Sequence, residues 1–231
     1  TRRPGKSDEQ MLVDLLVELN ADGIFLDTMT ATKMSLRRLC DEHSKGISLI
    51  PELNIAVNQL PYCNGSWAQY FIDKNPPGML KLKWLEPRHM QYQIKRWNSS
   101  HQSEIKSAFF NGSGMKIWEN VFGTYMPWNT QDRRDWKLAI GILREFSDIF
   151  TSRDWQPYYP TLNEKVYAHK WWGDGVTLFT ILNYSGEKLI EQELLELEVD
   201  DGVVYYDLWK GERIRPVVVK DKSVIKISLD E

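Results

Sequence analysis

The sequence predicts an α/β protein in which repeated βα units are followed by an antiparallel β part. Two observations support this fold class. Over roughly the first 150 residues, apolar runs of strand length alternate with helical stretches. After about residue 152 the helical periodicity stops, and short alternating segments follow, separated by turn signals such as "GDG", "DDG" and "KDK".

The first two βα units are well marked. Ser7 and Gln10 form a capping-box pattern at the start of a leucine-rich helix that runs to about Leu19. The run "DGIFLD" predicts a short apolar strand of the kind that is covered on both faces. A second helix over residues 34–43 and a second strand, "GISLIPEL", complete this part.

The next segments continue the alternation. We expect "GMLKLKWLEP" to be a strand, "RHMQYQIKRW" and "SEIKSAFF" to be helical, and "GMKIWENVFG" to be a strand. A long helix capped at Asn129 or Thr130 comes last, and the Pro- and Tyr-rich "WQPYYPTLNEK" then predicts a connection.

Each of the four expected strands ends in a carboxylate: Asp27, Glu52, Glu86 and Glu119. The intervals are 25, 34 and 33 residues, about one βα unit each. Parallel strands place such ends at one rim, which is where TIM barrels build their active sites. We therefore expect the C-terminal half of a (β/α)8 TIM barrel over residues 1–152, followed by an antiparallel β-sandwich over residues 153–231. The rest of the barrel is expected upstream or in another chain, and a small open four-stranded sheet is the alternative.

Composition narrows the class of function. The net charge of −3 gives no case for nucleic acid, and no apolar run approaches the roughly 18 residues of a membrane span. The start lacks the apolar core of a signal peptide, so any export signal is absent or already removed; a location outside the cytoplasm is favoured. No phosphate-binding glycine loop or G-x-S-x-G elbow occurs, and neither the histidines nor the two cysteines, Cys40 and Cys63, have metal-ligand spacing. We expect no cofactor and no metal.

Ten tryptophans and the acidic rim together suggest a carbohydrate substrate, because tryptophan stacks on the apolar faces of sugar rings. Glycoside hydrolysis needs two carboxyl groups, and we assign Asp27 as nucleophile and Glu52 as acid/base. The alternative interpretation of each acid is that it is not catalytic, and that its carboxylate is simply solvated at the end of a strand or forms an ion pair. The expected substrate-binding residues lie at or beyond strand ends: Trp67, Trp84, Glu86, His89, Trp118, Glu119, Asn120 and Trp128.

Three motifs carry a resemblance to a known family. "ADGIFLDTMT" resembles the nucleophile strand of TIM-barrel α-glycosidases, in which a D-G-aromatic-x-D run ends in the catalytic aspartate. "GMKIWENVFGTYMPW" looks like a final-strand motif, and "YYDLWKGERI" is similar to a turn in the β-domains of α-galactosidase-like and α-amylase-like enzymes. The resemblance implies a nucleophilic role for Asp27 and an acid/base role for Glu52.

Two other functions remain open at this point. A carbohydrate-binding protein would have the same cleft without productive carboxylate geometry. A structural or assembly protein would use its tryptophans only for packing.

Overall fold

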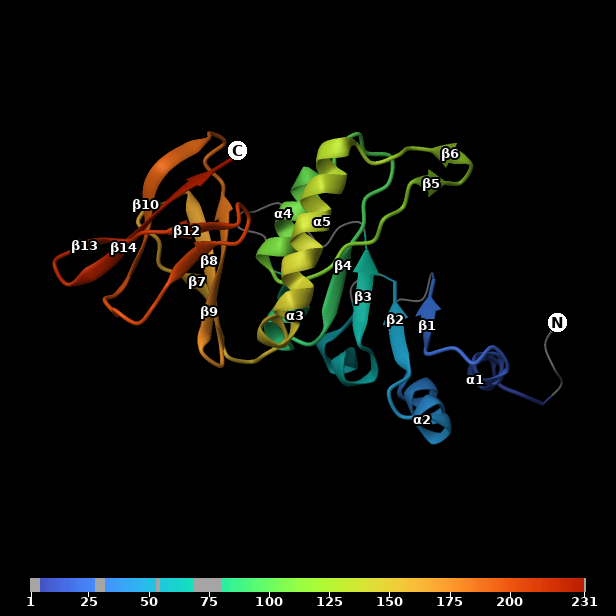
Figure 1. Ribbon diagram of the computed structural model, residues 1–231. Coiled ribbons are helices and arrows are strands. Elements are labelled where there is room, and N and C mark those ends of the chain that lie inside the picture. The colour runs from blue at the N-terminus through green and yellow to red at the C-terminus, as the bar shows by residue number, and fades with distance from the viewer. Residues whose placement is uncertain (1–4, 28–31, 53–54, 69–79, 231) are drawn as a thin grey trace.

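The computed structural model describes residues 5–27, 32–52, 55–68 and 80–230. It is a mixed α/β structure, with helices and parallel strands first and antiparallel strands after them (Figure 1). The elements of the first part are α1 (Asp8–Glu18), β1 (Gly23–Leu26), α2 (Met34–His43), β2 (Ser48–Pro51), the 3-10 helix η1 (Val57–Tyr62), β3 (Gly65–Ala68), α3 (Lys81–Leu85), β4 (Met90–Gln93), α4 (Gln102–Phe110), β5 (Asn120–Val121), β6 (Thr124–Tyr125), α5 (Thr130–Glu145) and α6 (Ser147–Phe150).

The first helices form as the sequence predicts. Ser7 caps α1 by accepting a hydrogen bond from the backbone N–H of Gln10 at 3.1 Å. The apolar side chains of α1 and α2 pack onto those of β1 and β2, and Leu36, Cys40 and Leu49 are almost completely buried there. This packing covers the outer face of the two strands.

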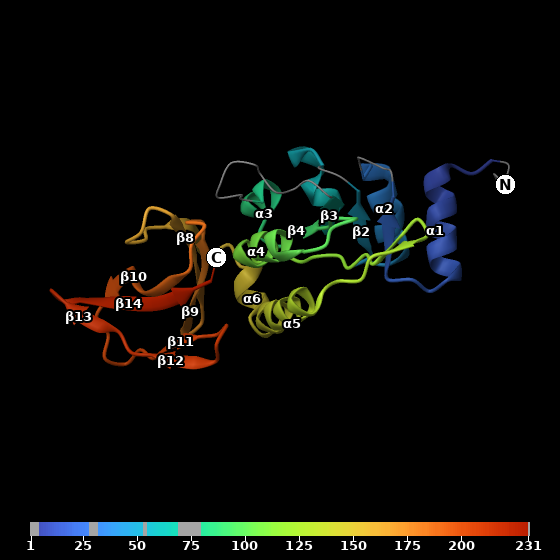
Figure 2. The same cartoon turned by 90° about the horizontal axis from the view of Figure 1, so that it is seen from above.

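Parallel pairing extends across the strands of the first part. β1 pairs with β2, and β3 pairs with β4, both in parallel. Isolated parallel bridges join Glu52 to Trp67 and Gln93 to Met115, so that five successive segments lie side by side. Figure 1 shows β1 to β4 pointing the same way, and in Figure 2, seen from above, α2 and α3 lie on one side of these strands with α1 at their end.

Two predicted elements are exchanged in the structure. "GMLKLKWLEP" is not a strand, because residues 81–85 form α3, and "RHMQYQIKRW" is not a helix, because residues 90–93 form β4. The Gln91 side chain explains both: its carbonyl oxygen accepts hydrogen bonds from the backbone N–H groups of Leu82 and Lys83. A buried glutamine in a strand breaks the apolar pattern, and a helix of five residues is too short to establish its own period.

Strand β3 was missed by the sequence analysis. Its residues, Gly65–Ala68, form no apolar run, and Ser66 is buried with its hydroxyl group 3.0 Å from Nε2 of His89. The last expected strand, "GMKIWENVFG", is only partly formed. Met115 bridges to Gln93, and β5 then turns into an antiparallel hairpin with β6.

Two later helices match the prediction. α4 covers all of "SEIKSAFF", and α5 begins after Asn129. The Asn129 side chain accepts a hydrogen bond from the backbone N–H of Asp132 at 2.8 Å, which caps α5.

The second part contains antiparallel sheets in the orders β7-β8-β9, β10-β14-β13 and β11-β12. Leu194, Leu195 and Ile225 pack with Val166 and Ala168 in a core that the two three-stranded sheets share. The predicted connection after residue 153 is partly wrong, because its first residues form β7. The strands are β7 (Trp155–Tyr159), β8 (Val166–Gly173), β9 (Val176–Asn183), β10 (Leu189–Glu198), β11 (Tyr205–Asp207), β12 (Glu212–Ile214), β13 (Val217–Val219) and β14 (Lys222–Leu229).

The antiparallel strands contact the helices of the first part directly. The Thr180 hydroxyl on β9 donates a hydrogen bond to the backbone carbonyl oxygen of Phe110 at 2.7 Å. Phe150 of α6 meets Trp171 of β8 edge-on, with ring centroids 5.2 Å apart. These contacts bury α4 and α6 against the sheet.

Candidate active site

Asp27 and Glu52 directly follow neighbouring parallel strands. Leu26 pairs with Pro51, and the backbone N–H of Glu52 donates to the carbonyl oxygen of Leu26 at 2.9 Å. The two acids are the next residues of β1 and β2 and therefore lie beside each other at the carboxyl ends of the strands. Asp27 is exposed, and Glu52 is half-buried. Thr28 and Thr30, next to Asp27 in the sequence, lie outside the described residues.

Alternation along the strands shows what else shares their face. Leu26 and Leu49 point into the helix-covered core, so Phe25 and Asp27 point to the other side. The parallel partners Glu52 and Trp67 share that side with them. The Phe25 and Trp67 rings stack there with centroids 4.9 Å apart. We call this side of the parallel strands the inner face.

Two further inner-face residues escaped the sequence analysis. Tyr92 of β4 is the partner of Trp67, and Lys116 follows Met115 one position past the bridge to Gln93. The Lys116 Nζ atom lies 2.8 Å from the Phe25 ring centroid and 4.9 Å from that of Trp67. Neither residue is a polar residue at the end of a predicted strand, which was the pattern used to find the other site residues. Only the register of the strands shows that both lie on the inner face.

The four tryptophans assigned to sugar binding have different surroundings. Trp67 is only 2% exposed, because it lies on β3 beneath Phe25 and Lys116 and not on a loop. Trp128 is 4% exposed and stacks on His101 in the core formed by α4 and α5. Trp84 is 50% exposed but belongs to α3. Trp118 is half-buried, and its ring centroid lies 6.2 Å from that of Trp67.

Glu86 and His89 lie at the opposite end of the strands from Asp27 and Glu52. The prediction that Glu86 closes a strand is wrong, since it caps the C-terminus of α3 and precedes the first residue of β4. A two-pronged hydrogen bond from Arg88 lowers the pKa of Glu86 to about 2, and Arg153 adds a second ion pair. His89 also precedes β4, and its burial lowers its pKa to about 4.

Glu119 and Asn120 fix the hairpin that follows Lys116. The Glu119 carboxylate accepts a hydrogen bond from the backbone N–H of Trp128 and pairs with Arg133 at 2.7 Å; both interactions lower its pKa. Asn120 begins β5, and its carbonyl oxygen accepts a hydrogen bond from the Trp118 indole. Figure 1 shows the β5–β6 hairpin extending past the carboxyl ends of the parallel strands.

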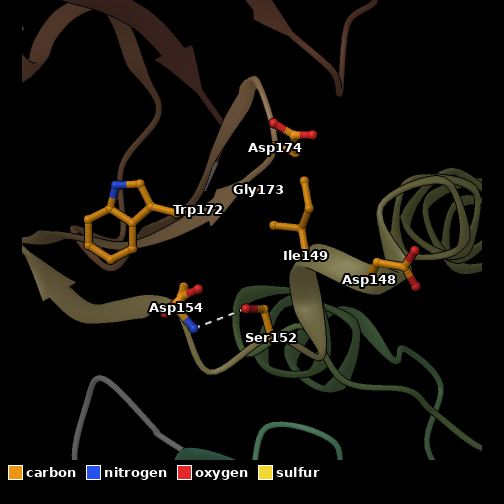
Figure 3. Close-up of a pocket in the computed structure, with 7 residues that line it drawn as sticks. All are labelled: Asp148, Ile149, Ser152, Asp154, Trp172, Gly173 and Asp174. Carbon is orange, nitrogen blue, oxygen red and sulfur yellow. Dashed lines mark hydrogen bonds between the residues drawn. The ribbon is translucent and has the colours of Figure 1, made fainter.

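A separate depression of about 330 Å³ lies between α6 and the β8–β9 hairpin (Figure 3). Asp148, Asp154 and Asp174 line it, with Trp172 at one side. The three carboxylates come from different segments and do not converge on one point in Figure 3. The depression includes no residue of the inner face, so the inner face remains the candidate site.

Within the part of the chain that the structure describes, no three His, Cys, Asp or Glu side chains gather closely enough to hold a metal ion. Among the same residues, no helix combines the length and the apolar character needed to cross a bilayer.

Comparison with known proteins identifies solved structures with a similar fold. No protein-family model and no curated protein sequence matches the chain. Solved structures do match. An Anoxybacillus α-amylase has a TM-score of 0.63 at 13% identity, over 96% of this chain and 60% of that chain. A maltogenic α-amylase from Thermotoga neapolitana has a TM-score of 0.62 at 12% identity, over 96% of this chain and 65% of that one. The structure of AmyP in complex with maltose has a TM-score of 0.58 at 13% identity, over 96% and 65%.

The chain thus spans less than two thirds of the length of these matched structures. Nearly all of it is superimposed on them, including both the parallel and the antiparallel parts. Over its own length, the chain has the fold of the corresponding portion of α-amylase-type glycoside hydrolases.

Proposed function

We propose that this chain supplies the carboxylate pair of a glycoside hydrolase, with Asp27 as nucleophile and Glu52 as acid/base. The observation that carries the proposal is the adjacency of these acids at the carboxyl ends of β1 and β2. The fold shared with α-amylases supports the same class of reaction.

The spacing of strands suits this chemistry. Neighbouring strands lie about 4.8 Å apart, so carboxyl groups at paired positions on one face of adjacent strands can approach to about 5 Å. Retaining glycosidases hold their two carboxyl groups about 5–5.5 Å apart. Asp27 then attacks the anomeric carbon while Glu52 protonates the departing oxygen. In the second step Glu52 takes a proton from water, which attacks the same carbon and releases Asp27.

The aromatic residues of the inner face define how the sugar is held. Phe25 is 48% exposed and stands two residues before Asp27 on the same side of β1. Lys116 and Trp67 lie against the Phe25 ring, and Arg96 lies against the Trp118 ring, so the exposed edges of the two rings are the apolar surface left for the C–H groups of a sugar. Trp67 acts from beneath by fixing the position of Phe25. The sequence also predicted Asn120 to bind substrate. It begins β5 in the hairpin near the carboxyl ends of the parallel strands, and we keep it as a proposed substrate-binding residue.

The domain organisation forms part of the same proposal. Residues 1–152 would be the C-terminal half of a TIM barrel, and residues 153–231 an antiparallel β-sandwich. Among the described residues, β1 pairs only with β2, so its other edge is open to a further strand. That strand would come from the rest of the barrel, whether upstream or in another chain.

The test is hydrolysis by the full-length protein with Asp27→Asn and Glu52→Gln variants. A panel of aryl α- and β-glycosides reports turnover. We expect Asp27→Asn to lower kcat by about 10³-fold or more. Glu52→Gln should lose about 10²–10⁴-fold on glycosides with poor leaving groups and much less on nitrophenyl glycosides, which need no protonation to leave.

Asp174→Asn is the matched control, because this exposed aspartate lies in the turn between β8 and β9 and should leave turnover unchanged. Full activity in Asp27→Asn would exclude Asp27 as nucleophile. Sugar binding by the wild type without turnover would support the non-catalytic alternative, and neither binding nor turnover would support a structural role.

A further inference from the structure

A half-buried cation, Lys116, lies on the inner face, below the two acids. The Lys116 Nζ atom is held over the Phe25 ring and near the rings of Trp67 and Tyr92. Phe25 and Asp27 are two residues apart on one strand, a rise of about 6.6 Å. The Lys116 ammonium group therefore marks the floor of the site, and the carboxylates mark its rim.

This ammonium group has no counter-ion in the part of the chain that the structure describes. Its contacts there are aromatic, and no carboxylate oxygen of those residues lies within 4 Å of Nζ. Burial alone lowers the pKa of Lys116 to about 8. A neighbouring carboxylate would raise this pKa, so Asp27 and Glu52 do not neutralise the cation.

A second cation follows the same pattern. The Arg96 guanidinium carbon lies 3.8 Å from the ring centroid of Trp118 and 5.3 Å from that of Phe122. Its Nε atom is buried and has no hydrogen-bond partner among the described residues. The Trp118 and Trp67 rings are neighbours, so Lys116 and Arg96 rest on one connected group of aromatic rings.

We propose, on the basis of the glycosidase function above, that the site accepts a sugar with an oxyanion substituent, held by Lys116 at the floor and by Arg96 on the same connected group of aromatic rings. The substituent is a carboxylate, sulfate or phosphate group. Aromatic faces hold the two cations in place but leave their N–H groups free to donate. A sugar hydroxyl would accept one hydrogen bond without compensating the charge. An oxyanion provides both the acceptor atoms and the compensating charge that a partly desolvated cation lacks.

Binding of free sugars tests the inference without depending on turnover. The probes are two matched pairs, glucose with glucuronate and galactose with galacturonate, together with glucose 6-sulfate and glucose 6-phosphate. Dissociation constants are measured by calorimetry on the full-length protein at low and high salt. We expect at least one anionic sugar to bind about 10-fold or more tightly than its neutral partner, with a smaller difference at high salt. The anionic sugar that binds most tightly shows whether the preferred substituent is a carboxylate, a sulfate or a phosphate group.

Variants of Lys116 identify the residue responsible. Lys116→Met keeps the length and apolar stem and should abolish the preference, whereas Lys116→Arg keeps the charge and should retain it. Arg96→Gln should reduce the preference. Lys137→Met is the matched control, because Lys137 is exposed on α5, and it should bind like the wild type.

Three results would overturn the inference: equal or tighter binding of the neutral sugars, no binding of any anionic sugar, or an unchanged preference in Lys116→Met. The two proposals fail separately. An anionic preference without any glycoside hydrolysis contradicts the hydrolase alone. Hydrolysis of neutral glycosides without an anionic preference contradicts the anion site alone.

Discussion

The ammonium group of Lys83 donates a hydrogen bond to the backbone carbonyl oxygen of Phe150 at 3.0 Å, although 67 residues separate the two in sequence. A second hydrogen bond, at 2.6 Å, goes to the carbonyl oxygen of Pro87. Lys83 is almost completely buried, so a residue of the short helix α3 ties the parallel part to the end of α6. These two carbonyl oxygens accept hydrogen bonds from two of its three N–H groups but carry no full negative charge.

Lys83 should make stability depend on pH. Burial lowers its pKa to about 7 from the ordinary value of 10.5. Between about pH 7 and pH 10.5 the unfolded chain holds the proton and the folded chain has lost it, so stability rises with pH in this window. Lys83→Met should remove a slope of up to about 1.4 kcal/mol per pH unit. Urea denaturation of wild type and variant from pH 6.5 to 10 measures the difference.

Lys137→Met serves as the control for Lys83→Met, because the side chain of Lys137 is exposed. An identical pH dependence in wild type and Lys83→Met would show that the buried amine is protonated over the whole range.

His169 should make the protein less stable at acidic pH. Its Nδ1 atom accepts a hydrogen bond from the backbone N–H of Tyr158, and its ring stacks on Phe110 with centroids 3.9 Å apart. Burial lowers its pKa to about 3, below the ordinary value of 6.5. As the pH falls from about 6.5 to about 3, the unfolded chain takes up a proton that the folded chain does not, and stability falls.

His169→Asn keeps an acceptor for the Tyr158 N–H but removes the titrating ring. This variant should be less stable at pH 7, because the stacking on Phe110 is lost, and its stability should fall less steeply in acid. Denaturation midpoints at pH 7, 5 and 4 provide the comparison. A variant as acid-sensitive as the wild type would exclude His169 as a contributor.

Two glycines should respond oppositely to alanine. Gly112 has a φ of +60°, and a Cβ atom there would lie 2.7 Å from the Phe150 ring. Gly112→Ala should therefore cost about 1–3 kcal/mol of unfolding free energy. Gly141 lies within α5, and no described atom outside the neighbouring backbone of its own helix lies within 4 Å of an added Cβ, so Gly141→Ala should stabilise by about 0.5–1 kcal/mol. Paired denaturation curves measure both. Unchanged or higher stability of Gly112→Ala would contradict the packing at Gly112, and lower stability of Gly141→Ala would contradict the open space at Gly141.

The sequence predicted those elements whose pattern is local and strong. The Ser7 cap, the two helices before residue 44 and the Asn129 cap of α5 are confirmed, because capping and helical periodicity depend on residues three or four positions apart. The apolar strands before Asp27 and Glu52 are also confirmed, because a short apolar run is buried on account of its own composition.

Shorter segments were less well determined. The stretch "KLKWL" fits a strand alternation as well as one helical turn, and only its contact with Gln91 settles the choice. This exchange of α3 and β4 also explains why Glu86 and His89 lie at the wrong end of the strands for the predicted site.

By itself, the sequence determined that Asp27 and Glu52 follow consecutive apolar strands, since burial of such runs requires only their own composition. Only the tertiary structure decided which side chains surround these acids. Strand register and packing placed Lys116 over Phe25 and buried Trp67 and Trp128, while the hairpin drew Glu119 to Arg133. Contacts between residues far apart in the chain depend on register, and a shift of one residue would turn each of these strand side chains to the opposite face.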